Sequence, residues 1–264
     1  MPAEKHPPLA GCIAEDALQL AWSEAPWDTA VFGAPVLQVT GIQVRDARKA
    51  AALMPRFEAA RDAAGSPFAS CRLPHDCLRE SMFLEQHGFR FIEMLFQPEF
   101  PDLQQATLAA PGGLTVHGAT DQDLAWAVEV AGQAFANERF HVDPRLPRGL
   151  GDRRYQNWVR SSLGHARQRL LVIREGRDAI AFFIVEQLED GTCYWHLTAV
   201  APDKQGQGYG ARVWATMLAH ARDAGASRIR TSVVARNHRV LNLYGRLRFR
   251  LSAPAMTFHW LRET

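Results

Sequence analysis

The chain has 264 residues, of which 47% are hydrophobic and 22% are charged, and its formal net charge is +2. This composition is typical of a globular protein with one large core or two smaller ones, and the small net charge argues against nucleic acid as a partner. Apolar runs stay short of the roughly 18 residues that a membrane span needs. The opening MPAEKHPPLAGC lacks the apolar core of a secretion signal, so we expect a cytoplasmic protein that does not enter a membrane.

The four cysteines do not form a metal-binding pattern. Within CRLPHDC, Cys71, His75 and Cys77 have the residue types of metal ligands, but no second cluster completes a site. We therefore expect free thiols and no metal.

The first half of the chain predicts a small mixed domain over residues 13–105. Residues 1–12 are polar and rich in proline, and we expect them to be disordered. A strand is expected over 36–44, and a helix over 46–65 that Pro55 interrupts and Gly65 ends. Residues 78–100 predict a helix, a stop at Gly88 and then a strand.

A stretch of small residues, prolines and glycines at 101–113 separates the halves, and we place the linker at 106–113. The second domain, 114–264, opens with a strand over 114–120. Thr120 and Asp123 have the spacing of a capping box ahead of an amphipathic helix. A loop over 137–151 and a helix over 153–163 follow.

Strands dominate from there on. They are expected over 169–175, 179–188 and 192–200, and a helix then runs to Asp223 with Gly225 as its stop. A strand over 228–234, a helix over 238–247 and a broken strand pair over 249–261 complete the domain. FLEQHGFRF at 83–91 and LYGRLRFRL at 243–251 are similar and close their respective halves, which suggests two related halves.

The glycines of QGQGYG, residues 205–210, lie where a strand gives way to a helix. Unpaired N–H groups of a first helical turn bind anions, and glycines let a phosphate approach them without a Cβ in the way. No Lys-Ser/Thr follows, which excludes the Walker loop, and the spacing does not fit the dinucleotide fingerprint. The stretch is therefore predicted to be an anion-binding loop of another kind.

This loop resembles the Gln/Arg-x-x-Gly-x-Gly/Ala motif of the GNAT superfamily of N-acetyltransferases. Asn237 and Tyr244 resemble the family's Asn-x-x-Ala-x-x-x-Tyr, with Val240 in place of Ala, and Arg248-Phe249 stands where the family has Gly-Phe. The resemblance covers about residues 114–262. It implies an α/β GNAT fold: a central mixed, mostly antiparallel sheet flanked by helices, with a smaller, degenerate GNAT-like half before it.

The resemblance also implies an enzyme that takes acetyl-CoA as acyl donor and transfers the acetyl group directly to an amine. Tyr244 is the expected general acid, since a tyrosine with a pKa of about 10 keeps its proton at neutral pH; the alternative is a packed core aromatic. The general base stays open between Glu186, His196 and a water molecule. The residues expected to bind the donor are Leu197, Ala199, Val200, Gln205, Gly206, Gln207, Gly208, Tyr209, Gly210, Ala211, Asn237 and Tyr244.

Three further segments give a narrower resemblance. WDTAVFGAPVLQV at 27–39, AFANERFHVDPRLP at 134–147 and YQNWV at 155–159 resemble the bacterial dTDP-fucosamine acetyltransferases, with Val31 in place of a Phe. That family implies, as acceptor, the 4-amino group of a dideoxyhexose linked to a nucleotide, and it points to polysaccharide biosynthesis.

Four residues are expected to bind this acceptor: Phe135, Arg139, Phe140 and Tyr155. Aromatic rings face sugars or bases, and arginines pair with diphosphates; the alternative is that the aromatic rings are core. The expected partner is a small-molecule amine, first an amino sugar nucleotide, while a homodimer stays open. The alternatives are another amine, such as a peptide N-terminus or an antibiotic, and an acyl-CoA-binding protein without catalysis. The sugar, the nucleotide and the length of the acyl group stay open.

Overall fold

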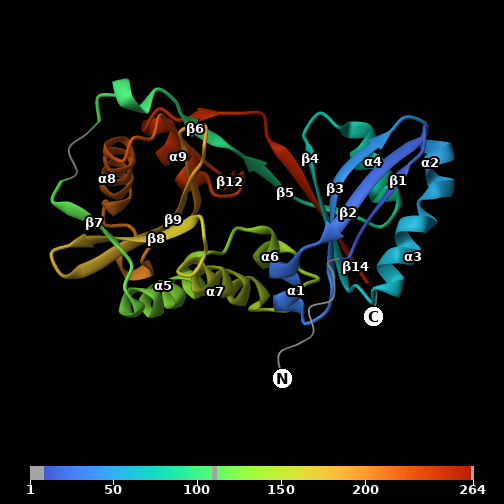
Figure 1. Cartoon of the computed structure of the whole chain (residues 1–264), viewed down its shortest axis with the longest axis horizontal. Coiled ribbons are helices and arrows are strands. Elements are labelled where there is room, and N and C mark those ends of the chain that lie inside the picture. The colour runs from blue at the N-terminus through green and yellow to red at the C-terminus, as the bar shows by residue number, and fades with distance from the viewer. Residues whose placement is uncertain (1–8, 109–111, 263–264) are drawn as a thin grey trace. The chain divides into compact units, whose positions relative to one another are not determined.

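The computed structural model describes residues 9–108 and 112–262, which divide into two compact units (Figure 1). Unit 1 comprises the chain up to Met94, Asp143–Arg145, and the chain from Pro254; unit 2 comprises Leu95–Val142 and Leu146–Ala253. The expected disordered residues 1–8, residues 109–111 of the expected linker, and residues 263–264 lie outside the described residues. The boundary between the units thus lies after Met94, before the expected linker at 106–113. The segment from Pro254 onward also belongs to unit 1.

Unit 1 is a mixed sheet with helices. Its strands follow the order β1-β2-β3-β4-β14-β5, in which β3 and β4 are parallel while β1/β2, β2/β3 and β4/β14 are antiparallel. Its elements are β1 (Ala10–Ala14), β2 (Leu18–Glu24), α1 (Pro26–Phe32), β3 (Val36–Val44), α2 (Ala47–Leu53), α3 (Pro55–Ala63), β4 (Phe68–Pro74), α4 (Leu78–Gln86), β5 (Arg90–Phe96) and β14 (Ala255–Leu261). The last two residues of β5 belong to unit 2.

Several local predictions for unit 1 agree with these elements. The strand over 36–44 is β3, and Pro55 separates α2 from α3 as its missing N–H requires. Gly65 and Gly88 both have positive φ after their helices. One expectation is corrected: β1 starts at Ala10, inside the stretch 1–12 that was expected to be disordered. Pairing with β2 and burial of Ile13 order this segment.

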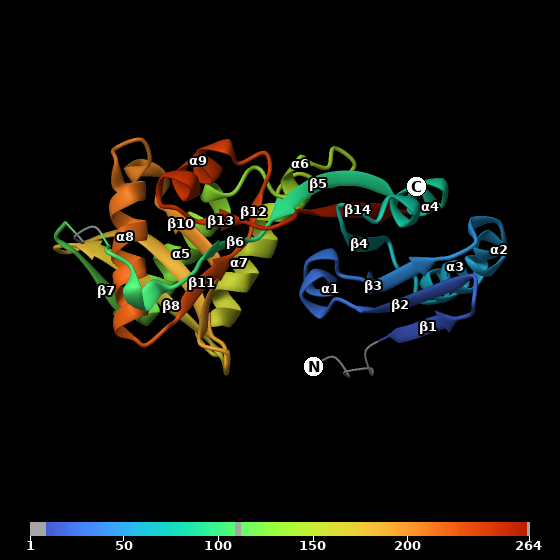
Figure 2. The same cartoon turned by 90° about the horizontal axis from the view of Figure 1, so that it is seen from above.

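Unit 2 holds a second mixed, mostly antiparallel sheet, as expected for this fold class. The strand order is β13-β6-β11-β10-β9-β8-β7, and β10/β11 is the parallel pair. Its elements are β6 (Pro98–Phe100), η1 (Leu103–Gln105), β7 (Leu114–Gly118), α5 (Asp121–Ala134), α6 (Arg139–Val142), α7 (Leu150–Ser162), β8 (Gln168–Glu175), β9 (Asp178–Gln187), β10 (Thr192–Val200), η2 (Pro202–Lys204), α8 (Tyr209–Asp223), β11 (Arg228–Thr231), β12 (Val233–Val234), α9 (His238–Arg246) and β13 (Arg250–Leu251) (Figure 2).

Two strands expected in the second half are divided in the structure. The strand over 228–234 is β11, paired with β10, and β12, paired with Leu95 and Phe96 of β5. The broken strand pair over 249–261 is also wrong, because its parts do not pair with each other. β13 pairs with β6 in unit 2, whereas β14 pairs with β4 in unit 1; Pro254 lies between the two strands.

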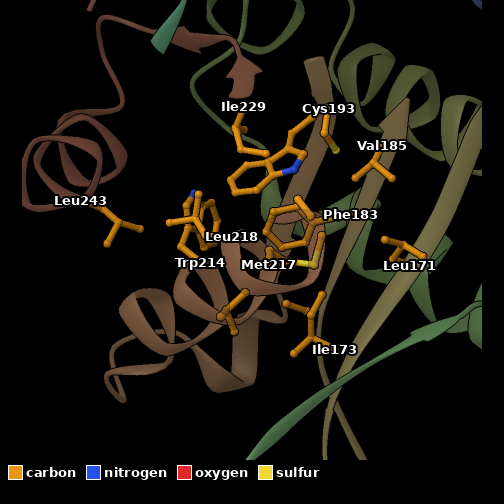
Figure 3. Packing of buried hydrophobic residues seen from close by; sticks show 14 of the residues in the cluster. Leu171, Ile173, Phe183, Val185, Cys193, Trp214, Met217, Leu218, Ile229 and Leu243 are labelled. Carbon is orange, nitrogen blue, oxygen red and sulfur yellow. The ribbon is translucent and has the colours of Figure 1, made fainter. Parts of the chain in front are cut away.

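The sheet of unit 2 has a hydrophobic cluster on each face. Alternate residues of β9 supply both: Phe183 packs in the cluster with α8 and α9, and Phe182 and Ile184 pack in the cluster with α5 and α7. Figure 3 shows Phe183 beside Met217 and Trp214 of α8. Side chains on the two faces of β9 therefore pack against both layers of helices, α8 and α9 on one face and α5 and α7 on the other.

Two further features bear on the class of protein. Nowhere in residues 9–108 and 112–262 is there a helix long and apolar enough to cross a bilayer. Within the same ranges, no group of three His, Cys, Asp or Glu side chains is placed to hold a metal ion. Cys71 and Cys77 are free thiols.

Candidate active site

The central feature of unit 2 is the point where β10 and β11 diverge. Their pairing covers only Thr192–Trp195 of β10, and at its end Thr231 Oγ1 donates a hydrogen bond to the Trp195 carbonyl, 2.9 Å away. The β10/β9 register shifts between Trp195 and Leu197, which places a bulge at His196. In the described part of the chain, residues 197–200 then have a strand partner only in β9.

The backbone of β10 beyond the bulge presents polar groups at this open edge. Ala201 N–H donates to the Ile180 carbonyl at 2.9 Å, so these two residues form a hydrogen-bonded pair. Because such pairs alternate along an antiparallel ladder, Leu197 and Ala199 direct their backbone groups towards β9, and Thr198 and Val200 direct theirs outward. Of the three strand residues predicted to bind the donor, only Val200 faces the open edge. Thr198, which also faces this edge, is not among the predicted residues, because the bulge that sets this phase leaves no mark in the sequence.

The glycine loop follows directly and is open to solvent. Gly206 and Gly208 have φ of +80° and +83°, and no atom lies within 4 Å of the position that a Cβ would take on either. Gly208 caps α8, whose first-turn N–H groups have no partner inside the helix. This cradle, which side chains would fill, fits a phosphate group, and it lies next to the open edge of β10. The pyrophosphate and amide-bearing arm of a CoA thioester match both features.

Side chains around the loop hold it in this conformation. Gln205 donates to the Val200 carbonyl at 3.0 Å, and Gln207 donates to the Asp203 carbonyl at 2.6 Å. The Tyr209 hydroxyl donates to Glu175 at 2.5 Å, and this carboxylate raises the pKa of Tyr209. These three predicted donor-binding residues therefore bond within the protein, at the base of the cradle.

Gly210, Ala211 and Asn237 lie at the starts of helices α8 and α9. A Cβ on Gly210 would lie 3.7 Å from Leu243 Cδ2, an ordinary contact distance, so this position faces α9 without requiring a glycine. Ala211 is exposed in the first turn of α8. Asn237 is the N-cap of α9, accepting a hydrogen bond from Val240 N–H at 3.2 Å.

Tyr244 is buried in the cluster between the sheet and α8. Its ring packs 4.7 Å from that of Phe249 and 6.4 Å from that of Trp214. Burial raises the pKa of Tyr244 to about 12, and the neighbouring Trp214 and Thr231 side chains offset part of that rise. The phenol therefore keeps its proton at neutral pH. Its neighbour Thr231 is the last residue of β11 before the divergence.

The four residues predicted to bind the acceptor fall into two kinds. Tyr155 stacks on Phe135 with ring centroids 4.5 Å apart and on Trp158 at 6.3 Å, and only 7% of it is exposed. Phe140 is buried beneath the Arg139 guanidinium, which lies 4.2 Å from its ring centre. Tyr155 and Phe140 thus support the surface, whereas Phe135 and Arg139 are partly exposed.

Two of the candidate bases are partners. His196 Nε2 lies 2.8 Å from Glu186 Oε2, and Arg167 Nε lies 3.1 Å from Glu186 Oε1. The His196 ring meets Trp158 edge-on at 6.1 Å and Tyr194 at 4.8 Å. Burial lowers the pKa of His196, although hydrogen bonding to Glu186 opposes this. The aromatic stack of Phe135, Tyr155 and Trp158 therefore leads to the bulge in β10.

Comparison with known proteins agrees with this geometry. Residues 133–249 match the model of the Acetyltransferase (GNAT) family. The spore coat polysaccharide biosynthesis protein SpsD of Bacillus subtilis (strain 168) is 18% identical over 245 residues, covering 91% of this chain and 82% of that protein.

Two solved structures are similar in fold. A GCN5-related N-acetyltransferase from Kribbella flavida has a TM-score of 0.60 at 16% identity, covering 96% of this chain and 90% of its own. A tandem GNAT protein from the clavulanic acid biosynthesis pathway has a TM-score of 0.58 at 13% identity, covering 98% and 85%. The second likeness agrees with two GNAT-like halves in one chain. Residues 133–249 therefore match the Acetyltransferase (GNAT) family, whose enzymes take their acyl group from acetyl-CoA.

Proposed function

We propose that unit 2 transfers an acetyl group from acetyl-CoA to the amino group of a nucleotide-linked amino dideoxy sugar. The observation that supports the transfer is the solvent-open cradle of Gly206 and Gly208 next to the unpaired edge of β10 at Thr198 and Val200. A CoA thioester needs both an anion site for its phosphates and a strand partner for its amide-bearing arm, and these two features lie next to each other.

The donor supplies an acetyl group already activated as a thioester. The N–H groups of the glycine loop and of the first turn of α8 hold its phosphates. The outward N–H and C=O groups of Thr198 and the outward N–H group of Val200 orient its amide-bearing arm, as a peptide is held at a sheet edge. Tyr244 holds a proton at neutral pH, and we assign to it the protonation of the leaving thiolate at the divergence of β10 and β11.

The acceptor assignment rests on the face formed by α5, α6 and α7. Half-exposed Phe135 and Trp158 offer apolar surface to a sugar ring or a base, while Arg139 offers a cation to a diphosphate. SpsD, whose name places it in polysaccharide biosynthesis, is consistent with a sugar acceptor. Both observations favour a nucleotide sugar over a cationic antibiotic.

An acceptor panel tests this proposal. Thiol release from acetyl-CoA would be followed with dTDP- and UDP-linked amino dideoxyhexoses, several peptides and an aminoglycoside. We expect turnover with a nucleotide sugar alone. In the Arg139→Ala variant, KM for the sugar should rise about tenfold, the loss of one charge-assisted contact, while KM for acetyl-CoA stays unchanged. Arg160, an exposed arginine near the end of α7, gives the control variant Arg160→Ala.

Turnover with a peptide or the aminoglycoside would keep the acetyl transfer and discard the sugar. Binding of acetyl-CoA with no turnover on any amine would discard the catalytic function.

A further inference from the structure

The Glu186–His196 pair has the arrangement of an oriented base. An ionised carboxylate only accepts hydrogen bonds, so the 2.8 Å contact requires that His196 Nε2 carry a proton. A neutral ring has one N–H, and Nδ1 is then left with a lone pair. Among residues 9–108 and 112–262 no hydrogen bond to this nitrogen is found. The carboxylate thereby selects the tautomer that can accept a proton at Nδ1.

The surroundings keep this pair in the correct charge state. Glu186 is 5% exposed, and Arg167 Nε lies 3.1 Å from its second oxygen. The groups facing His196 are Glu186 from β9, Tyr194 from β10, and His165 and Arg167 from the loop between α7 and β8. From α7 the packed side chain is Trp158, which is uncharged. Burial lowers the pKa of His196 below its ordinary 6.5, and the Coulombic effects of His165 and Arg167 act in the same direction.

The position of the pair also suits this role. His196 occupies the bulge where β10 leaves β11, one residue before the unpaired edge. Its side chain is 21% exposed, so an acceptor bound along the aromatic stack can reach it. Glu186 is almost covered, and His196 is the member of the pair that an amine can meet.

We propose that His196 is the general base of the acetyl transfer and that Glu186 is its positioning residue. This inference rests on the proposed function. The amine lone pair forms the new C–N bond as the thioester C–S bond breaks, and His196 Nδ1 takes the proton that the nitrogen loses. Tyr244 gives a proton to the thiolate, and the imidazolium returns one through solvent, so the enzyme ends in its starting state.

The first test observes the histidine in the absence of any ligand. Long-range proton–nitrogen NMR spectra of the full chain should show that the His196 ring is neutral and protonated at Nε2 at pH 7. The His196 signals are assigned by their absence in the spectrum of His196→Gln. In Glu186→Gln the midpoint of its titration should move to lower pH, since the carboxylate raises that pKa. A ring protonated at Nδ1, or one charged at pH 7, would overturn the proposal.

The second test uses the pH profile of kcat/KM with the acceptor found active. The wild type should lose activity with a midpoint below pH 6.5, where His196 takes up a proton. His196→Gln should lose this limb and about 10²-fold in kcat/KM, with acetyl-CoA affinity unchanged. Glu186→Gln should lower kcat and move the limb to more acidic pH. His117→Gln, an exposed histidine on β7, should match the wild type.

The two proposals fail in different ways. An acidic limb that persists unchanged in His196→Gln removes His196 as the base while acetyl transfer stands. Absence of turnover with every amine removes the proposed function, and the tautomer measured by resonance still decides whether the pair is arranged as described.

Discussion

Tyr244 is both a core residue and a neighbour of the point where β10 and β11 diverge. It is packed like a core residue, 1% exposed, and yet its hydroxyl neighbours Thr231 at the divergence of two strands. The raised pKa of about 12 means that it stays protonated over the whole working range of pH. A residue of this kind supplies a proton and does not remove one.

We predict that Tyr244→Phe lowers kcat by about 10²-fold or more, the usual contribution of a general acid. The ring remains to pack against Phe249 and Trp214, so the fold and the affinity for acetyl-CoA should be retained. Stopped assays of thiol release measure kcat, and calorimetric titration with CoA measures the affinity for the donor. Unchanged turnover would show that Tyr244 is only a core aromatic.

Single residues show where sequence reasoning reached its limit. The relative placement of Asn237 and Tyr244 is predictable from the sequence, because a helix fixes the distance between them. Arg248 stands where the family has glycine, and its φ is +64°. The chain therefore keeps the left-handed turn without the residue that usually allows it. Tyr155 of α7 stacks between Trp158 of the same helix and Phe135 at the end of α5. No local sequence pattern predicts this contact between two helices.

At the scale of elements, α8 is bounded by two glycines with nearly the same backbone. Gly208 before the helix has φ of +83°, and Gly225 after it has φ of +90°, with open space at both. An added Cβ is strained to the same degree at either position, since both lie in the left-handed region. Only Gly208 lies in the anion cradle.

This pairing gives a matched test. We predict that Gly208→Ala and Gly225→Ala each lower the free energy of unfolding by about 1 kcal/mol. Gly208→Ala should in addition weaken acetyl-CoA binding by about tenfold, because the Cβ takes space next to the N–H groups that a phosphate needs. Equal affinity in the two variants, measured by calorimetry, would contradict the assignment of the loop.

Elements were predictable where their signals are local. Pro55, Gly65 and the Thr120–Asp123 capping box act within a few residues, and the structure has each as expected. The bulge at His196 is different, because it arises from unequal pairing with β9 and β11. Glu186 lies opposite Tyr194 in the ladder with β9, two residues before His196. This register is not visible in the sequence, so the pair stayed unresolved among the candidate bases.

At the scale of the whole molecule, the chain passes between its two units more than once. The short segment Asp143–Arg145 belongs to unit 1, where Asp143 Oδ2 lies 2.9 Å from His259 Nδ1 of β14. Burial would raise the pKa of Asp143, but hydrogen bonds from His259 and Arg145 outweigh it and hold the pKa well below its ordinary 3.8. The carboxylate therefore contributes stability above pH 3.8, which is lost as the pH falls towards the lowered value.

We predict that Asp143→Asn lowers the free energy of unfolding at pH 7 by about 3 kcal/mol, the cost of breaking a buried pair. The difference from the wild type should shrink as the pH falls below 3.8. Urea unfolding followed by circular dichroism at pH 7 and pH 3 measures both. Asp203→Asn, at an exposed aspartate beside Lys204, should have little effect at either pH. A gap that stays constant with pH would contradict the role of the charge.

The place of β14 in the sheet has a consequence for how the protein is made. It lies between β4, which ends 181 residues before β14 begins, and β5, which ends 159 residues before β14 begins. A nascent chain therefore leaves the ribosome with an unfilled slot in its first sheet, and two strand edges stay available to neighbours until residue 261 has emerged. The first sheet is thus begun early and completed only when β14 has been made, and chains truncated before β14 would be prone to aggregate.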